Sequence, residues 1–265
     1  MKFSEASAVQ RVGAGSYTAE IQPGWDIFGV ANGGYLLATL ARAMGEEAVG
    51  RDLVSISARF LNPGREGPVS MEVETLKQGR GTTTLQGRMT AGDRTLFVAH
   101  ATFAVPGMGA EVNASFEQAP EVPPPDQCLR LLPVDDAPLP PPFSTKVGIL
   151  MRPEDAVMGE AAEGRSPDIK GWFHLLDGEL IDPYGLILAA DAFPPAVFTA
   201  NLPLGWTPTI DVSVYVRDAG PHEIVKSHVD TRHVTDGWLE EDVEMWGSSG
   251  RLVAQSRQLA LLAKG

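Results

Sequence analysis

The chain has little cysteine and no long apolar run. Its 265 residues include one cysteine, Cys128, so an intramolecular disulfide is excluded. A single cysteine is typical of a reducing compartment, and we therefore expect a cytoplasmic protein. No apolar run approaches the roughly 18 residues that cross a bilayer. The N-terminus has no apolar segment after Lys2, so we expect neither a membrane span nor a signal peptide.

Positive charge is also scarce, with 21 Lys and Arg against 34 Asp and Glu and a net charge of −13. General nucleic-acid binding needs a basic face, so we expect no nucleic-acid partner. An anionic ligand would need local basic side chains or backbone N–H groups to hold it. The five histidines are scattered, without metal-ligand spacing, and no phosphate-binding or dinucleotide-binding glycine motif occurs. We therefore expect no metal and no cofactor.

Proline divides the chain into two halves. Nine of the 21 prolines lie between Ala119 and Pro142. Proline fixes φ and removes a hydrogen-bond donor, so this stretch is expected to be neither a helix nor a central strand. The interpretation is an N-terminal domain over residues 1–112, an extended linker over 113–142 and a C-terminal domain over 143–265.

The N-terminal half predicts a buried helix followed by an antiparallel sheet. After a short strand at residues 17–21, residues 35–44 are almost all apolar and rich in helix formers. Four segments with period-two alternation follow, near residues 54–60, 69–74, 82–90 and 95–105. In the first segment we expect one face to carry Val54, Ile56, Ala58 and Phe60.

The C-terminal half repeats this order. An apolar helix is expected over residues 180–193, and alternating strands near residues 210–216, 223–233, 238–246 and 251–262. The last strands also align in sequence, with Phe97-Val98-Ala99 opposite Leu252-Val253-Ala254. The chain therefore contains one unit twice, each an antiparallel sheet with an apolar helix, which is an α+β architecture.

Several motifs resemble the double-hotdog acyl-CoA thioesterases of the thioesterase II type. The N-terminal motif is the stretch Gly24-Trp25-Asp26 with Asn32-Gly33-Gly34 opening a helix. The C-terminal motifs surround Asp191, Thr209 and Gln258. The resemblance implies a tandem hotdog, in which each half wraps its sheet around a central helix. It also implies that Asp191, Thr209 and Gln258 form a triad that activates water.

The residues themselves leave alternatives open for this triad. Asp191 ends an apolar run. If it is buried there, its pKa would be raised and it would be a better base near neutral pH. The alternative is that Asp191 is the solvated end of a helix. Pro194 and Pro195 predict a helix end just past it. Thr209 is expected on the strand face of Asp211, where the residues alone favour a β-branched side chain on a wet sheet face, and only the resemblance implies that its hydroxyl positions Asp191 or the water. Gln258 lies on a small apolar face and needs a partner if buried, or it is exposed at an edge.

The start of the first helix is the second candidate element. Asn32 can cap this helix, and Gly33 and Gly34 let a ligand approach the free N–H groups. We expect these residues to bind substrate by polarising its carbonyl, or simply to allow capping and close packing. Asp26 is the alternative catalytic carboxylate, because single-hotdog thioesterases carry an aspartate in a similar context.

The function implied by the resemblance is hydrolysis of an acyl-CoA to free acid and CoA. The sequence has no Gly-x-Ser-x-Gly motif, and Cys128 lies in the linker, so direct attack by water is expected. The alternatives are a hotdog enoyl-CoA hydratase or dehydratase, which would use a histidine, and a non-catalytic acyl-CoA-binding protein. We expect a homo-oligomer, a dimer or larger, since hotdog units pair into continuous sheets.

Overall fold

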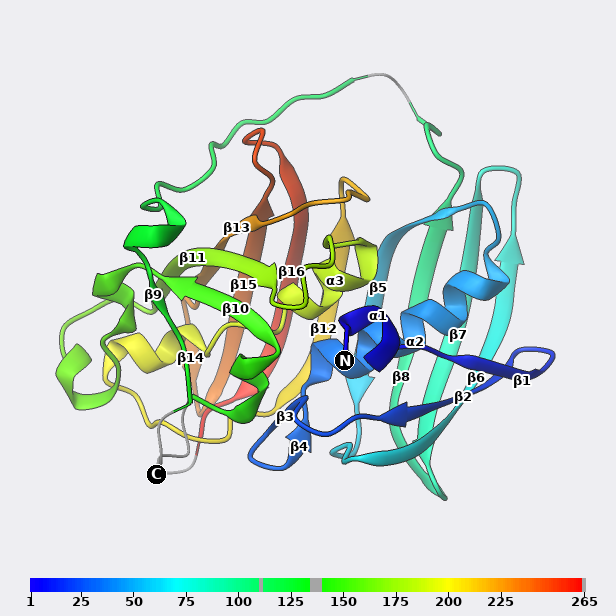
Figure 1. Cartoon of the computed structure of the whole chain (residues 1–265), viewed down its shortest axis with the longest axis horizontal. Coiled ribbons are helices and arrows are strands. Elements are labelled where there is room, and N and C mark those ends of the chain that lie inside the picture. The colour runs from blue at the N-terminus through cyan, green and yellow to red at the C-terminus, as the bar shows by residue number, and fades with distance from the viewer. Residues whose placement is uncertain (110–111, 134–139, 264–265) are drawn as a thin grey trace.

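The computed structural model describes residues 1–109, 112–133 and 140–263. One curved antiparallel sheet of 14 strands forms the body of the molecule, and the helices lie on one side of it (Figure 1). The strand order is β1-β2-β6-β7-β8-β5-β12-β16-β15-β13-β11-β10-β9, and β14 pairs with β15. The order in the second half mirrors the order in the first half about the β5–β12 junction.

The N-terminal half contains two helices and eight strands within its described residues. They are α1 (Phe3–Ala6), β1 (Gln10–Gly13), β2 (Ser16–Ile21), β3 (Asp26–Ile27), β4 (Val30–Ala31), α2 (Gly33–Glu47), β5 (Asp52–Phe60), β6 (Gly67–Gln78), β7 (Thr82–Ala91) and β8 (Arg94–Ala104). Strands β3 and β4 form a separate two-stranded hairpin. The other strands belong to the large sheet.

The C-terminal part also places strands before and after its longer helix. Its strands and longer helix are β9 (Leu129–Arg130), β10 (Val147–Met151), β11 (Asp168–Leu175), α3 (Pro183–Ala189), β12 (Thr209–Val216), β13 (Val225–Asp230), β14 (Val234–Thr235), β15 (Trp238–Trp246) and β16 (Leu252–Leu261). Short 3-10 helices cover Pro125–Gln127, Pro142–Thr145, Pro153–Ala156, Gly159–Ala162 and Ala196–Ala200. The edge strand β9 and one 3-10 turn lie within the segment interpreted as a linker, of which residues 134–139 are outside the described residues.

Helix α2 is buried, as its composition predicts. Its side chains from Tyr35 to Met44 are almost all inaccessible, and it packs against β2, β5, β6, β7, β8 and α3. Asn32 caps it, because Asn32 Oδ1 accepts a 2.9 Å hydrogen bond from the Tyr35 N–H. Trp25 is buried beside it and stacks on Tyr35 with ring centroids 5.0 Å apart. This packing positions the loop that leads into α2.

Helix α3 is shorter than the expected helix over residues 180–193. It begins at Pro183, where Asp182 Oδ1 accepts a 2.7 Å hydrogen bond from the Gly185 N–H, and ends at Ala189. The expected length was wrong because the apolar run continues beyond the helix into a buried turn. That turn contains Asp191, and the following Pro194 and Pro195 prevent a further helical turn.

Strands β10 and β11, which the sequence pattern does not predict, extend the second half of the sheet. Strand β11 does alternate, with Ile169, Gly171, Phe173 and Leu175 facing inward. The glycine and the charged residues around it weaken the apolar signal. With these strands included, β2, α2, β5, β6, β7 and β8 correspond in order to β11, α3, β12, β13, β15 and β16.

A β-bulge corrects the expected face of the first alternating strand. Pairing between β5 and β8 shifts register between Leu53 and Ser55. Leu53 is therefore buried at 3% exposure, whereas Val54 is 37% exposed and does not share the inner face of Ile56 and Ala58. The extra residue of a bulge turns the preceding side chain to the other face of the sheet.

The bulge predicts unequal effects of two neighbouring truncations. We expect Leu53→Ala to lower the free energy of unfolding by about 2–4 kcal/mol, because it removes a buried side chain. Val54→Ala should change it by about 0.5 kcal/mol or less. Urea denaturation of both variants measures this, and a larger loss for Val54→Ala would contradict the bulge.

Candidate active site

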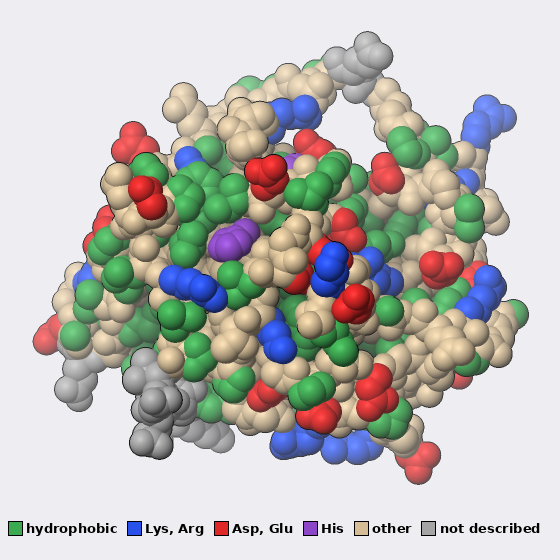
Figure 2. All heavy atoms as spheres, viewed as in Figure 1, with side chains coloured by type: hydrophobic (Ala, Val, Ile, Leu, Met, Phe, Trp, Pro, Cys, Tyr) green, Lys and Arg blue, Asp and Glu red, His purple; other side chains and the backbone are tan. Residues whose placement is uncertain are grey.

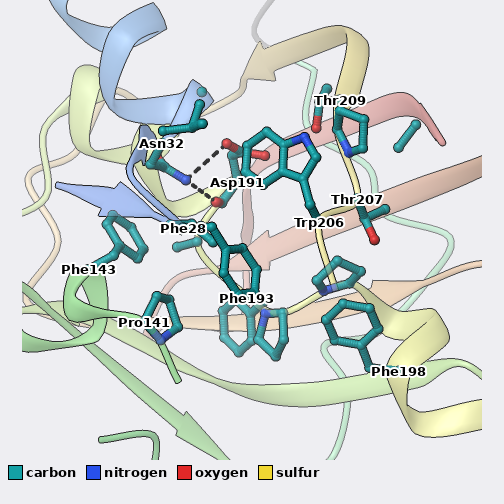
Figure 3. A pocket seen from close by; sticks show the side chains of 18 of the residues that line it. Phe28, Asn32, Pro141, Phe143, Asp191, Phe193, Phe198, Trp206, Thr207 and Thr209 are labelled. Atoms are coloured by element: carbon teal, nitrogen blue, oxygen red, sulfur yellow. Dashed lines mark hydrogen bonds between the residues drawn. The ribbon is translucent and has the colours of Figure 1, made fainter. Parts of the chain in front are cut away.

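The two halves enclose a cavity of about 680 Å³ at the point where α2 begins and α3 ends. Its apolar wall includes Phe60, Phe143, Phe193, Phe198 and Trp206. Several of these aromatic side chains surround Asp191 in Figure 3. Asn32, Asp191, Thr209, Glu241 and Gln258 supply polar side chains to the same cavity. The structure therefore brings together residues from both halves of the chain.

Asp191 is held by the start of helix α2. Its Oδ2 atom accepts hydrogen bonds from the Gly34 N–H at 2.8 Å and from Asn32 Nδ2 at 3.0 Å. Asn32 Nδ2 also donates to the Asp191 carbonyl oxygen at 2.7 Å (Figure 3). A carboxylate is favoured at a helix N-terminus, where free N–H groups and the helix dipole meet it. This network joins the second half of the chain to the first.

Burial raises the pKa of Asp191 to about 6, against the hydrogen bonds from Gly33, Gly34 and Asn32, which lower it. A pKa near 6 makes the side chain mostly ionised at neutral pH and still able to accept a proton. Asp191 can therefore exchange a proton near neutral pH. It is not a solvated helix end.

The two glycines of Asn32-Gly33-Gly34 permit this close approach. A Cβ atom on Gly34 would lie 2.9 Å from both Asp191 Cβ and the Ile187 carbonyl oxygen. On Gly33 it would lie 3.0 Å from Asp191 Oδ2 and 3.1 Å from the Phe60 ring. The N–H groups that we expected to face the substrate carbonyl therefore donate to Asp191. Asn32 also caps α2, and the two glycines allow close packing, as the alternative interpretation expected.

Thr209 and Gln258 form a second hydrogen-bonded group. Thr209 Oγ1 donates to Gln258 Oε1 at 2.8 Å, and Gln258 Nε2 donates to Glu241 Oε1 at 2.8 Å. Gln258 is buried at 4% exposure. It is therefore a partnered interior amide, not one exposed at a strand edge.

The expected face of Thr209 was wrong. The pairing of β12 with β16 shifts register between Thr209 and Asp211, and Thr209 pairs with the buried Ala260. This irregularity places Thr209 on the inner face with Gln258, opposite to Asp211. Thr209 bonds Gln258 and does not contact Asp191 through a hydrogen bond among the described residues.

Glu241 is a buried cavity residue that the sequence analysis does not single out. It lies on the inner face of β15 with Leu239, Val243 and Met245, and is 5% exposed. Burial and the charge of Asp191 raise its pKa to about 8, against hydrogen bonds from the Ala196 N–H and Gln258. The sequence signal that could have identified Glu241 is a single carboxylate among the apolar residues on the inner face of β15.

The alternative residues lie away from this cavity. Asp26 Oδ2 accepts a 3.0 Å hydrogen bond from the Gly29 N–H within its own turn, and Asp26 does not line the cavity. Cys128 does not line it either, and burial raises the pKa of its thiol, which disfavours the thiolate. No group of His, Cys, Asp and Glu with metal-binding geometry occurs in the described part of the chain.

On the face shown in Figure 2, basic side chains lie among acidic and apolar ones. Among the described residues that line the cavity, Arg130 is the only Lys or Arg. None of the described helices is long and apolar enough to cross a membrane.

Comparison with known proteins identifies the family. Residues 21–104 match the acyl-CoA thioesterase N-terminal domain, and residues 119–262 match the acyl-CoA thioesterase C-terminal domain. An uncharacterized protein of Mycobacterium tuberculosis is 26% identical, over 93% of this chain and 90% of the relative. The motifs around Asn32, Asp191, Thr209 and Gln258 lie within the two matched regions.

Solved structures agree in fold. A proposed thioesterase II from Thermobifida fusca superposes with a TM-score of 0.87 and 32% identity, covering 99% of this chain and 97% of that chain. A hot dog protein of unknown function from Alicyclobacillus acidocaldarius superposes with a TM-score of 0.84 and 19% identity, covering 99% and 98%. The chain therefore belongs to the acyl-CoA thioesterase family and has the hotdog fold.

Proposed function

We propose that this protein hydrolyses an acyl-CoA thioester to a free acid and CoA by direct attack of water, with Asp191 as the general base. The observation that carries the proposal is the position of Asp191, a carboxylate with a pKa of about 6 in the wall of a cavity. Membership of the acyl-CoA thioesterase family supports the substrate class. At neutral pH the ionised carboxylate can take a proton from water as it attacks.

The proposed architecture is a tandem hotdog, with units over residues 1–112 and 143–265 joined by a linker over 113–142. The mirrored strand order about β5 and β12 supports this division. In this arrangement α2 is the central helix of the first unit and α3 that of the second. The β5–β12 pairing would then replace the sheet pairing that two separate hotdog units make.

The second polar group has a separate role in the proposal. Thr209 and Gln258 lie in the same cavity as Asp191 but make no hydrogen bond to it among the described residues. The Gln258 amide can donate to the water or to the oxygen of the thioester carbonyl, where negative charge develops. Asn32, Gly33 and Gly34 would act through Asp191, by holding its carboxylate in place.

The apolar wall of the cavity would hold the acyl chain between the two halves. Its aromatic and proline side chains are uncharged and apolar, which suits the hydrocarbon chain of a fatty acyl group. Arg130 is then our candidate contact for the phosphates of CoA, because it is the basic residue that lines the cavity. Because the net charge is −13, local basic side chains or backbone N–H groups must hold these phosphates.

The hydratase and binding-protein alternatives predict different chemistry. A hotdog hydratase would use a histidine as acid and base, and the described residues that line the cavity include no histidine. A non-catalytic acyl-CoA-binding protein would have no use for an Asp191 side chain with a pKa near neutrality. We also retain two sequence-based proposals, a homo-oligomer and a cytoplasmic location.

Release of free thiol from acyl-CoAs of different chain lengths tests the proposed function. We expect wild-type protein to cleave at least one member of the panel, with a preference set by the apolar cavity. Hydration of an enoyl-CoA is the parallel assay. Thioester cleavage by none of the panel would overturn the proposal, and hydration without cleavage would favour the hydratase.

A further inference from the structure

Glu241 is a buried carboxylate in the cavity that the proposed chemistry does not yet use. It is 5% exposed and lies on an inner strand face that is otherwise apolar. Burying a carboxyl group there costs free energy unless its oxygens are hydrogen-bonded. Both oxygens of Glu241 have partners, and one of them is Gln258.

These partners form a directional chain of hydrogen bonds. The Ala196 N–H donates to Glu241 Oε2 at 2.8 Å, and Gln258 Nε2 donates to Glu241 Oε1 at 2.8 Å. Thr209 Oγ1 in turn donates to Gln258 Oε1. An amide side chain presents an oxygen at one end and an NH₂ group at the other, and either order would fit a pocket of the same shape.

We propose that Glu241 is a positioning residue that fixes the orientation of the Gln258 amide. This inference rests on the proposed thioesterase function. An ionised carboxylate only accepts hydrogen bonds, so it selects the NH₂ end of Gln258 as its neighbour. One N–H of Gln258 then bonds Glu241, and the other remains for the water or the thioester carbonyl. The Gln258 oxygen stays with Thr209.

A glutamine at position 241 would reverse this order without changing the shape of the side chain. Its amide oxygen would take the place of Glu241 Oε2 and accept from the Ala196 N–H, so its NH₂ group would face Gln258. The Gln258 amide would then turn its oxygen toward position 241 and its nitrogen toward Thr209 Oγ1. Every buried polar group keeps a partner in this arrangement, so the fold is retained while the N–H that serves the reaction is moved.

Glu241→Gln is therefore the test, with Glu244→Gln as the matched control. Glu244 lies on the same strand but on the opposite face from Glu241, paired with Gln255. At about pH 9, where Glu241 is ionised, we expect Glu241→Gln to lower kcat by about tenfold or more, with little change in KM and no loss of melting temperature. Glu244→Gln should leave kcat unchanged. Unchanged kcat in Glu241→Gln would overturn the inference.

The pH profile separates positioning from a structural role. The groups near Glu241 are Asp191 and Asp230, which act on it through charge, and the donors Ala196 and Gln258. Ionisation of Glu241 fixes the Gln258 amide, so wild-type kcat should rise in a second step near pH 8, above the step of Asp191 near pH 6. Glu241→Gln should lack the second step. A retained second step would contradict the proposal.

The double variant that combines Glu241→Gln with Gln258→Glu provides an independent check. The new amide at position 241 would donate to the new carboxylate at position 258, and Thr209 and Ala196 would keep their acceptors. The double variant therefore keeps a hydrogen bond at every link between Ala196, position 241, position 258 and Thr209. The side chain at position 258, however, no longer carries an N–H group. We expect a folded protein with very low kcat, and wild-type turnover by this variant would overturn the role of that N–H. Failure of wild type to cleave any thioester would instead overturn both the proposed function and this inference.

Discussion

Replacing Asp191 with asparagine is expected to lower kcat by about 100-fold or more while leaving the chain folded. The asparagine side chain has the same shape, and its oxygen can accept the hydrogen bonds now donated by Gly34 and Asn32 to Oδ2. It cannot take a proton from water. The change therefore removes the base but keeps the hydrogen bonds that link the start of α2 to the turn after α3.

Thiol release by the purified variant measures this effect, and circular dichroism reports its fold. Asp26→Asn is the matched control, since Asp26 bonds the Gly29 N–H and lies outside the cavity lining. We expect Asp26→Asn to keep most of the wild-type kcat. The opposite result, a large loss for Asp26→Asn and none for Asp191→Asn, would assign the base to Asp26.

Asp191 also makes activity and stability depend on pH in opposite directions. In wild type, kcat should fall as pH drops through about 6, because protonated Asp191 cannot act as a base. Its pKa is raised on folding from 3.8 to about 6, so the folded state binds the proton more tightly. Its contribution to stability is full below pH 3.8 and is lost as pH rises through 6.

Asp191→Asn should therefore gain stability relative to wild type at higher pH. Two pKa units correspond to about 3 kcal/mol, which is the upper limit of the gain. Thermal unfolding of both proteins at about pH 5 and about pH 8 measures the difference, which should be larger at the higher pH. A wild type that gained stability over the variant between these pH values would contradict the raised pKa.

Replacing Gly34 with alanine is expected to damage both stability and activity. Its Cβ would lie 2.9 Å from the Ile187 carbonyl oxygen and 3.1 Å from the Leu188 carbonyl oxygen, which are backbone atoms of α3 that cannot move alone. The two helices must therefore separate. Overpacking of this kind costs about 1–3 kcal/mol, although alanine favours a helix more than glycine does.

Separation of the helices would also lengthen the hydrogen bonds that hold Asp191. We therefore expect kcat to fall by about tenfold or more, with a smaller change in KM. Glu46→Ala is the control, because Glu46 is exposed on the same helix and its replacement should change stability by about 0.5 kcal/mol or less. A Gly34→Ala protein with full activity and an unchanged melting temperature would show that the close approach is not needed.

Local pattern was sufficient to predict much of this fold. The apolar run of α2 predicts a buried helix, and period-two alternation predicts β6, β7, β8, β13, β15 and β16, because both patterns depend only on which side chains face the core. The proline-rich stretch predicts a division between the halves. The resemblance of short motifs to the thioesterase II type also identified Asn32, Asp191, Thr209 and Gln258 as residues to examine, and they line one cavity.

Other features depend on contacts between distant residues. Two register shifts, at Leu53 and at Thr209, are set by pairing with β8 and β16, and each moves a side chain to the other face. The end of α3 and the approach of Gly34 to Asp191 depend on how two helices pack across the halves. A sequence pattern records which face a residue prefers, but not which distant strand sets the register.

The sequence by itself therefore determined the buried helix α2, most of the longer strands and the candidate residues of this protein. Only the tertiary structure decided that Asn32 and Gly34 donate to Asp191, that Thr209 turns inward to Gln258, and that Glu241 joins them. The physical reason is that hydrogen bonds and pKa values depend on distance and burial, and these are set by packing between segments far apart in the chain.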